Sequence, residues 1–270
     1  MAASARPTIW ARFVRSPWRD ILQFVLLVAL VVWLVTQSSA RLGYNWQWYR
    51  VPRYLWQVRE GGVQSGALLE GLGFTLRISL VSLICSLALG LLVALLRLSD
   101  SFMGRLLSRA YLEVIRNTPL VVQMYLAYFV AGPILGIGRF ASAVLALSLF
   151  EGSYMSEIFR AGITSLHRGQ WEAAYSLGLS TVDTYRDVIL PQALRRLLPP
   201  LTGEIISLIK NTSLVSLVSL ADLSMQARVV AADTFLTFEV WFTTALLYLA
   251  IMIPLALLAR WLERHYTLLT

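Results

Sequence analysis

Two opposite charges inside apolar stretches are the residues of this chain best suited to chemistry. Glu151 lies in one such stretch, and Lys210, the single lysine of the chain, lies in another. Charges at membrane depth are costly and often mark a function. Either the two residues pair with each other or with the backbone and hold helices together, or they bind a ligand. In that case Glu151 attracts an ammonium group and Lys210 a carboxylate, assisted by Tyr154 one helical turn from Glu151.

Other catalytic patterns are missing from the sequence. The one lysine lies outside any Gly-x-x-x-x-Gly-Lys-Ser/Thr pattern, so the chain has no P-loop for ATP. His167 and His265 do not form the His-Glu-x-x-His motif of a zinc hydrolase, and no serine lies in a Gly-x-Ser-x-Gly elbow. Lone Cys85 cannot form an intramolecular disulfide. We therefore expect no catalytic residue, metal site or cofactor in this chain.

The elements that must position the two charges are membrane spans. Hydrophobic residues make up 57% of the 270 residues and charged residues only 14%, which is more apolar surface than a soluble core needs. A helix crosses the hydrocarbon with about 20 apolar residues, and at about 1.5 Å per residue both charges come near the bilayer centre. The sequence predicts an all-α integral membrane protein with about six transmembrane helices. They are expected near Trp18–Thr36, Leu72–Leu96, Pro119–Leu135, Phe140–Phe159, Leu201–Leu220 and Val240–Ala259.

The arginines predict the orientation of these spans. Most of them fall in the N-terminal tail, in the segments 97–116 and 160–196, and near the C-terminus, which all lie on one side of the membrane if the spans alternate. Cytoplasmic loops carry such an excess of basic residues, so both termini are expected in the cytoplasm. The net charge of +8 then reflects topology and phospholipid contact rather than nucleic-acid binding.

The first span admits two interpretations. Its arginines, apolar run and the small residues Ser38 and Ala40 resemble a cleavable signal peptide, but the run extends back to Trp18, which suits an uncleaved anchor. The following loop is rich in tryptophan and tyrosine between Tyr44 and Trp56. Such aromatic residues favour the outer membrane surface, with partner docking as the alternative.

A polar stretch, residues 169–191, interrupts the apolar pattern. Good helix formers precede Gly178, which suits a left-handed helix end, and Ser180 or Thr181 could cap a second helix. Leu190 before Pro191 is expected to end that helix. Ala173 and Ala174 leave one side of the first helix with little bulk. We therefore expect two short helices at a fixed angle that present a smooth docking surface.

This stretch resembles the EAA loop in the membrane subunits of bacterial ABC importers. The resemblance rests on Glu172-Ala173-Ala174, on Gly178, and on Val188-Ile189-Leu190-Pro191, with Val188 where that pattern usually has isoleucine. Further blocks resemble the polar amino acid uptake branch of these permeases. They are Tyr111–Leu120, Gly152–Ile163, Pro191–Leu194 and Lys210–Leu214.

The resemblance implies a division of the chain and a set of partners. Residues 1–69 would hold the cytoplasmic tail, an added first span and the aromatic-rich extracytoplasmic loop. Residues 70–265 would form the five-helix permease core, with a coupling loop at 165–195 that docks into a cytoplasmic ATPase. The implied ATPase contacts are Gly169, Gln170, Glu172, Ala173, Ala174, Gly178 and Pro191.

On this resemblance the chain is a multi-pass permease subunit in the inner membrane that carries a polar or charged amino acid. ATP and magnesium would bind the ATPase. Further implied partners are a second permease subunit, identical or not, and an extracytoplasmic solute-binding protein. The expected substrate path takes in Glu151, Tyr154, Lys210 and Ser213, while Glu157 and Arg160, three residues apart, are expected to form a structural ion pair. A membrane-embedded enzyme and a non-transporting scaffold remain as alternatives.

Overall fold

The structure is a computed structural model that describes residues 21–30, 33, 37, 43–59 and 62–266. It consists of two units that divide between Gln47 and Trp48. Ile21–Leu30 in the first unit is an apolar helix shorter than a span. The N-terminal arginines lie outside the described residues, and so does the predicted choice between anchor and cleaved signal at Ser38 and Ala40.

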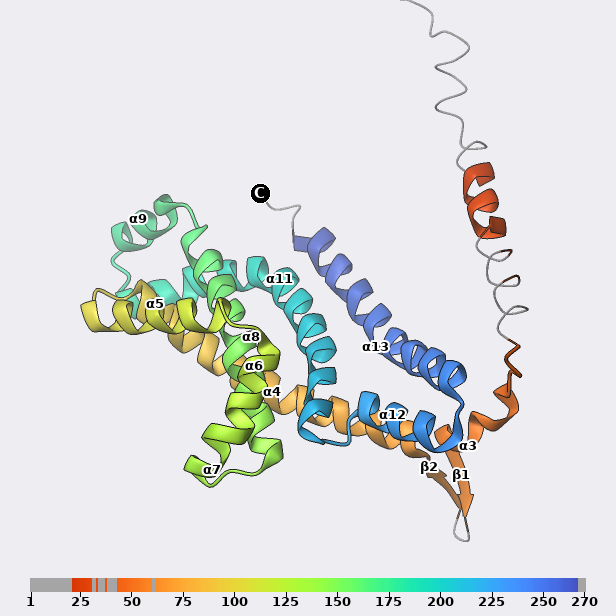
Figure 1. Cartoon of the computed structure of the whole chain (residues 1–270). Coiled ribbons are helices and arrows are strands. Elements are labelled where there is room, and N and C mark those ends of the chain that lie inside the picture. The colour runs from red at the N-terminus through yellow and green to blue at the C-terminus, as the bar shows by residue number, and fades with distance from the viewer. Residues whose placement is uncertain (1–20, 31–32, 34–36, 38–42, 60–61, 267–270) are drawn as a thin grey trace, which may run out of the picture. The chain divides into compact units, whose positions relative to one another are not determined.

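The second unit opens with short elements and then becomes almost entirely helical (Figure 1). The short elements are η1 (Trp48–Arg50), α3 (Pro52–Leu55), β1 (Trp56–Arg59) and β2 (Gly62–Ser65). The two strands pair antiparallel, with Trp56 opposite Ser65. Part of the predicted aromatic-rich loop is therefore a β-hairpin, a small addition to an otherwise helical fold.

Two long helices, α4 (Ala67–Leu98) and α8 (Arg139–Thr164), form the central pair of this unit. A Cβ atom added to Gly90 of α4 would lie 2.9 Å from the Cβ of Met155 and 3.0 Å from the carbonyl oxygen of Gly152 on α8. Small side chains recur every four residues on both helices and allow this close approach. They are Ser82, Ser86 and Gly90 on α4, and Ser148, Gly152 and Ser156 on α8, all of them buried.

A sharp bend separates α5 (Phe102–Arg116) from the helical run Leu120–Leu135. The run comprises α6 (Leu120–Tyr125), the π-helical η2 (Leu126–Ala131) and α7 (Gly132–Leu135). Its axis makes an angle of 105° with α5. Pro119 lies at the bend, where it disfavours helical geometry in the residue before it. The two helices therefore point in different directions and cannot form one straight span.

The chain stays helical from Thr181 to Val218, which corrects the predicted helix end at Leu190 and Pro191. The run comprises α10 (Thr181–Asp183), the π-helical η3 (Thr184–Ile189), α11 (Leu190–Asn211) and the 3-10 helix η4 (Thr212–Val218). The Leu190 N–H donates to the carbonyl of Tyr185, five residues earlier. This wider turn makes room for the ring of Pro191, so the helix passes the proline without breaking. Two further prolines, Pro199 and Pro200, lie inside α11.

Of the last two helices, α12 (Leu223–Thr234) packs against α4, and α13 (Thr237–Tyr266) packs against α11 and α12. Asp222 caps α12 by accepting hydrogen bonds from the N–H groups of Ser224 and Met225, both at 3.0 Å. The core shared by these helices includes Leu68, Leu223 and Val240, all fully buried.

The predicted number of six spans is not confirmed. Within the described part of the chain, three helices are long and apolar enough to cross a bilayer, and a fourth is added if α5 and the run Leu120–Leu135 count as one broken span. The three are Ala67–Leu98, Thr181–Val218 and Thr237–His265. α8 has 26 residues but carries Glu151, Glu157 and Arg160, and it is not among them.

Candidate functional sites: a capped hairpin and a charged pocket

The polar stretch forms a hairpin whose first helix, α9 (Arg168–Ser176), ends at Gly178. Gly178 has the predicted left-handed conformation, with φ of +79°. The Leu179 N–H donates to the Ala174 carbonyl at 3.2 Å, and the Gly178 N–H donates to the Tyr175 carbonyl at 2.9 Å. These two bonds define a Schellman motif, which fixes the direction in which the chain leaves the helix.

Side chains cap both helices of the hairpin. Ser180 is the residue that caps the second helix, where its hydroxyl accepts from the Asp183 N–H at 3.2 Å. At the start of α9, His167 Nδ1 accepts from the Gly169 N–H at 3.1 Å. From the sequence, His167 was considered as a zinc ligand, and this capping role was missed. Its position directly before the helix-forming stretch was the available signal.

Internal contacts fix the hairpin to the ends of α8 and α11. The Trp171 and Tyr185 rings meet edge to face at 4.9 Å, and the Gln192 amide donates to the Gln170 side chain at 3.0 Å. Beneath them lies a core cluster of buried aliphatic side chains from the ends of both helices. Its buried members are Ile163, Leu166, Ile189, Ala193 and Leu197.

The structure corrects the predicted smooth face of Ala173 and Ala174. Ala173 is exposed, but Ala174 is only 3% exposed and packs inside its own chain. A partner therefore cannot contact both alanines in this conformation. Sequence spacing placed them in one motif, but neighbouring residues of a helix point about 100° apart, so one faces outward and the other inward.

Exposed apolar side chains on the hairpin were not singled out by sequence reasoning. Leu177 is 81% exposed, Val182 73% and Tyr175 47%. Most of the predicted ATPase contacts on the same hairpin are exposed as well, and Gly169 is partly exposed. The exposed ones are Gln170, Glu172, Ala173, Gly178 and Pro191. Single exposed apolar residues are common on protein surfaces, but Tyr175, Leu177 and Val182 all fall within residues 175–182 of one hairpin, and we call these three the apolar patch.

An exposed ion pair adds charge to the second arm of the hairpin. Arg186 makes a bidentate contact with Asp187, with Nε–Oδ1 at 2.8 Å and Nη2–Oδ2 at 2.9 Å. The hydrogen bonds from the guanidinium lower the pKa of the Asp187 carboxyl. Asp187 therefore stays ionised, and the hairpin presents both charges beside its apolar patch.

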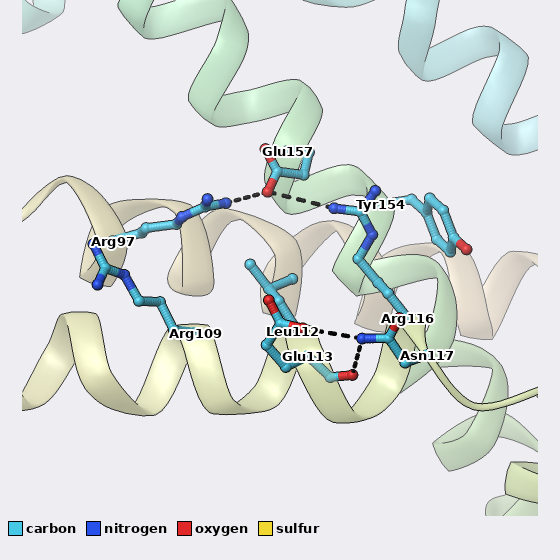
Figure 2. A pocket seen from close by; sticks show the side chains of 8 residues that line it. All are labelled: Arg97, Arg109, Leu112, Glu113, Arg116, Asn117, Tyr154 and Glu157. Atoms are coloured by element: carbon cyan, nitrogen blue, oxygen red, sulfur yellow. Dashed lines mark hydrogen bonds and ion pairs between the residues drawn. The ribbon is translucent and has the colours of Figure 1, made fainter.

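A charged pocket of about 340 Å³ lies where α4, α5 and α8 meet. Figure 2 shows Glu157 between Arg97 on one side and Arg116 on the other. Glu157 forms an ion pair with Arg97, contacts Arg116 at 3.5 Å and contacts Arg160 at 3.0 Å. The Arg116 guanidinium also lies 5.2 Å from the centre of the Tyr154 ring. The predicted pair of Glu157 and Arg160 is present, as one part of a larger cluster.

The structure does not bring Glu151 and Lys210 into an ion pair within the part of the chain it describes. Glu151 is fully buried and accepts a hydrogen bond at 2.8 Å from the side-chain amide of Asn211. Glu204 of α11 lies beside the same carboxylate. Lys210 is exposed. Residues 210 and 211 point in different directions on α11, so Asn211 and not Lys210 contacts the Glu151 carboxylate.

No side-chain hydrogen bond joins the other two residues of the expected substrate path to Glu151 or Asn211 within the described structure. Tyr154 lines the charged pocket, while the Ser213 hydroxyl donates to the Lys210 carbonyl at 2.8 Å. Asn211 was missed as the partner of Glu151. Its position next to the lysine was a signal, because an amide can satisfy a buried carboxylate at a lower desolvation cost than a second charge.

Comparison with known sequences gives the chain its relatives. A family model described as binding-protein-dependent transport system inner membrane component matches residues 86–268. The glutamine transport system permease protein GlnP of Escherichia coli (strain K12) is 40% identical over 205 residues, which cover 75% of this chain and 94% of that protein. The probable amino-acid ABC transporter permease protein YckA of Bacillus subtilis (strain 168) is 36% identical, and the match covers 74% of this chain and 88% of that protein.

Solved structures agree with these relatives. An amino acid ABC transporter with histidines superimposes with a TM-score of 0.67 at 35% identity, over 74% of this chain and 94% of that one. The inward-facing MetNI methionine ABC transporter shares the fold, with a TM-score of 0.61 at 19% identity over 74% of this chain and 95% of that one. The sequence resemblance to importer permeases is therefore confirmed, and the chain belongs to the family of binding-protein-dependent transport system inner membrane components.

Proposed function

We propose that this chain is the permease subunit of an ABC importer that carries an amino acid across the inner membrane, driven by a separate ATPase. The relatives support the substrate class, because GlnP is named as a glutamine permease and YckA as a probable amino-acid permease. The chain has no P-loop of its own, so ATP and magnesium bind the ATPase. The proposal favours neither a membrane-embedded enzyme nor a passive scaffold.

The observation that carries the proposal is the rigid hairpin with its exposed apolar patch. Leu177, Val182 and Tyr175 extend from an element that is capped at both helices and anchored on α8 and α11. A docking element must be stiff to transmit a movement, and its apolar side chains supply the contact area. We assign the ATPase contact to this patch together with Gln170, Glu172, Ala173 and Gly178.

The apolar patch changes the list of ATPase contacts that the resemblance to the EAA loop implied. Ala174 is excluded from direct contact because it is buried, and its role is to accept the hydrogen bonds that end α9. Gly169 and Pro191 remain in the proposal at the edges of the hairpin. Glu172 is exposed and offers the charge that a basic side chain on the ATPase could pair with.

For the substrate path we propose the buried carboxylate of Glu151 as the group that meets the substrate ammonium. The Asn211 amide donates to that carboxylate at 2.8 Å and orients it. A carboxylate at membrane depth is costly in hydrocarbon and is stabilised by a bound cation. Lys210 in α11 and Ser213 in η4 remain proposed path residues, and Tyr154 lines the charged pocket. A second permease subunit and an extracytoplasmic solute-binding protein complete the assembly, with both termini of this chain in the cytoplasm.

The test compares Leu177→Ser with Ile134→Ser in the full chain. Ile134 in α7 is 77% exposed, so the control removes an equally exposed aliphatic side chain from an element outside the hairpin. We expect Leu177→Ser to reduce co-purification with the ATPase and ATP-driven uptake by about tenfold or more, since loss of a central contact residue costs about 2 kcal/mol. Ile134→Ser should keep full co-purification with the ATPase. Full ATP-driven uptake by the Leu177→Ser protein would contradict the assigned docking role.

A further inference from the structure

Helix α5 has an apolar face that the described residues of its own chain leave exposed. Its opposite face is buried against α4 and α8 through Gly104, Ser108 and Leu112, and is tied there by the Tyr111 hydroxyl, which donates to the Leu149 carbonyl at 2.5 Å. The apolar face repeats at helical spacing and is between 49% and 72% exposed. It consists of Phe102, Met103, Leu106, Leu107 and Val114.

The bend at Pro119 determines how this face lies relative to a membrane. The run Leu120–Leu135 makes an angle of 105° with α5. If that run is inserted along the bilayer normal, α5 lies almost parallel to the surface. The preceding helix α4 ends at Leu98, only a few residues before α5 begins, so α5 starts at the level where a span reaches the headgroups. A helix lying flat at that level places one side toward the acyl chains and the other toward water.

Unbalanced positive charge borders the apolar face. Arg109 forms no ion pair or hydrogen bond with any residue of the described chain, and Figure 2 shows it rising from α5 on the same side of the charged pocket as Arg97. The pocket has three arginines but only two carboxylates, Glu113 and Glu157. Glu157 is already shared among three guanidinium groups, including that of Arg160 from outside the pocket lining. The hollow of about 340 Å³ beside Arg109 is therefore suited to a phosphate-sized anion.

We propose that α5 is a lipid-binding helix that lies in the headgroup layer and holds an anionic phospholipid. The acyl chains cover the face formed by Phe102, Leu106 and their neighbours, and the lipid phosphate binds Arg109 at the mouth of the charged pocket. Arg97 and Arg116 add long-range attraction but stay paired with Glu157. A lipid is the occupant that matches both halves of the surface, because it joins an apolar tail to an anionic group. That this leaflet is the cytoplasmic one rests on the proposed function, whereas the lipid contact does not.

The test measures lipid retention by the purified full chain, with no transport assay. The protein is placed in nanodiscs that contain phosphatidylglycerol and phosphatidylcholine in equal amounts, and the lipids that stay bound after release into detergent are counted by native mass spectrometry. We expect preferential retention of phosphatidylglycerol. Arg109→Gln should reduce that preference about fivefold, since one arginine near an anionic surface contributes a factor of this size, and Arg109→Lys should keep most of it.

Arg195→Gln is the matched control. Arg195 is an exposed arginine near the hairpin, has no partner in the described structure, and its removal changes the net charge by the same amount. An equal loss of preference in both variants would mean unspecific attraction and would overturn the proposal. Equal displacement of the lipid by inorganic phosphate alone, or disulfide-linked dimers of Leu106→Cys in a Cys85→Ser background, would also overturn it. The first would show a free-anion site, and the second would show that another copy of the chain covers the apolar face.

Discussion

His167 caps the first turn of α9, the first helix of the hairpin. Its Nδ1 satisfies the Gly169 N–H, one of the four donors that a helix leaves open at its start. We expect His167→Ala to lower the local stability of α9 by about 1 kcal/mol and hydrogen-exchange protection of residues 168–176 by about fivefold, whereas His167→Asn keeps an acceptor and most of the protection. Equal protection in the alanine and asparagine variants would show that the cap does not stabilise this helix.

Predictions for single residues were correct where the backbone conformation requires a particular residue type. They were wrong where the role of a residue depends on the direction in which its side chain points. Gly178 was predicted correctly because few other residues adopt a positive φ without strain. Lys210 was one of the partners considered for Glu151 but forms no ion pair with it in the described structure, and Ala174, which was expected at the docking surface, is buried. In each case the adjacent residue, Asn211 or Ala173, takes the expected orientation. The direction of a side chain around a helix is set by tertiary packing, which the local sequence does not contain.

The contact between α4 and α8 gives an opposite pair of predictions within one helix. Gly90→Ala places a Cβ against Met155 and the Gly152 carbonyl, and it should lower the free energy of unfolding by about 1 to 3 kcal/mol. Gly73→Ala, also in α4, meets no atom within 4 Å, and it should leave stability unchanged or raise it by up to about 1 kcal/mol. The melting temperature of each purified variant in detergent checks both. A Gly90→Ala protein as stable as the Gly73→Ala protein would contradict the close packing.

Elements were predictable from the sequence in their type more than in their number or their ends. The apolar stretches became α4, α11 and α13, and the polar stretch became the hairpin. The helix end at Pro191 was wrong, because the rule that proline stops a helix assumes an α turn, and the π turn before Pro191 removes the steric conflict. The repeat of small residues on α4 and α8 is present in the sequence. Only the structure shows that the two repeats face each other and allow the helices to pack closely.

The orientation of the whole chain can be tested with two single cysteines. In a Cys85→Ser background, Gln64→Cys lies in β2 and Ser176→Cys lies in α9. With the hairpin in the cytoplasm, we expect an impermeant thiol reagent to label Gln64→Cys in cells with only the outer membrane permeabilised. Ser176→Cys should react only once the inner membrane is opened. The reverse order of labelling would place the hairpin outside and contradict the proposed topology.

At the scale of the molecule, composition predicted a helical membrane protein, and the family match supports the importer fold. The number of spans was less predictable. α8 carries four charged residues that lower its hydropathy, and α5 turns away by 105° from the run that follows it. Mean hydropathy is an average over a whole helix. It therefore cannot show that the charged side chains of α8 face the charged pocket or neighbouring helices. The surfaces proposed to bind partners are recognised by the exposure of their apolar side chains, which the sequence pattern does not give.

The paired prolines of α11 divide the long helical run that leads away from the hairpin. Pro199 and Pro200 have no N–H to donate, so the carbonyls four residues earlier, at Arg195 and Arg196, lose their partners within the helix. Two consecutive backbone hydrogen bonds of α11 are therefore missing between its hairpin end and its apolar C-terminal half. Because a helix that lacks these bonds bends more easily, we expect any movement imposed on the hairpin to be taken up at Pro199 and Pro200, while the helix beyond Pro200 keeps its packing.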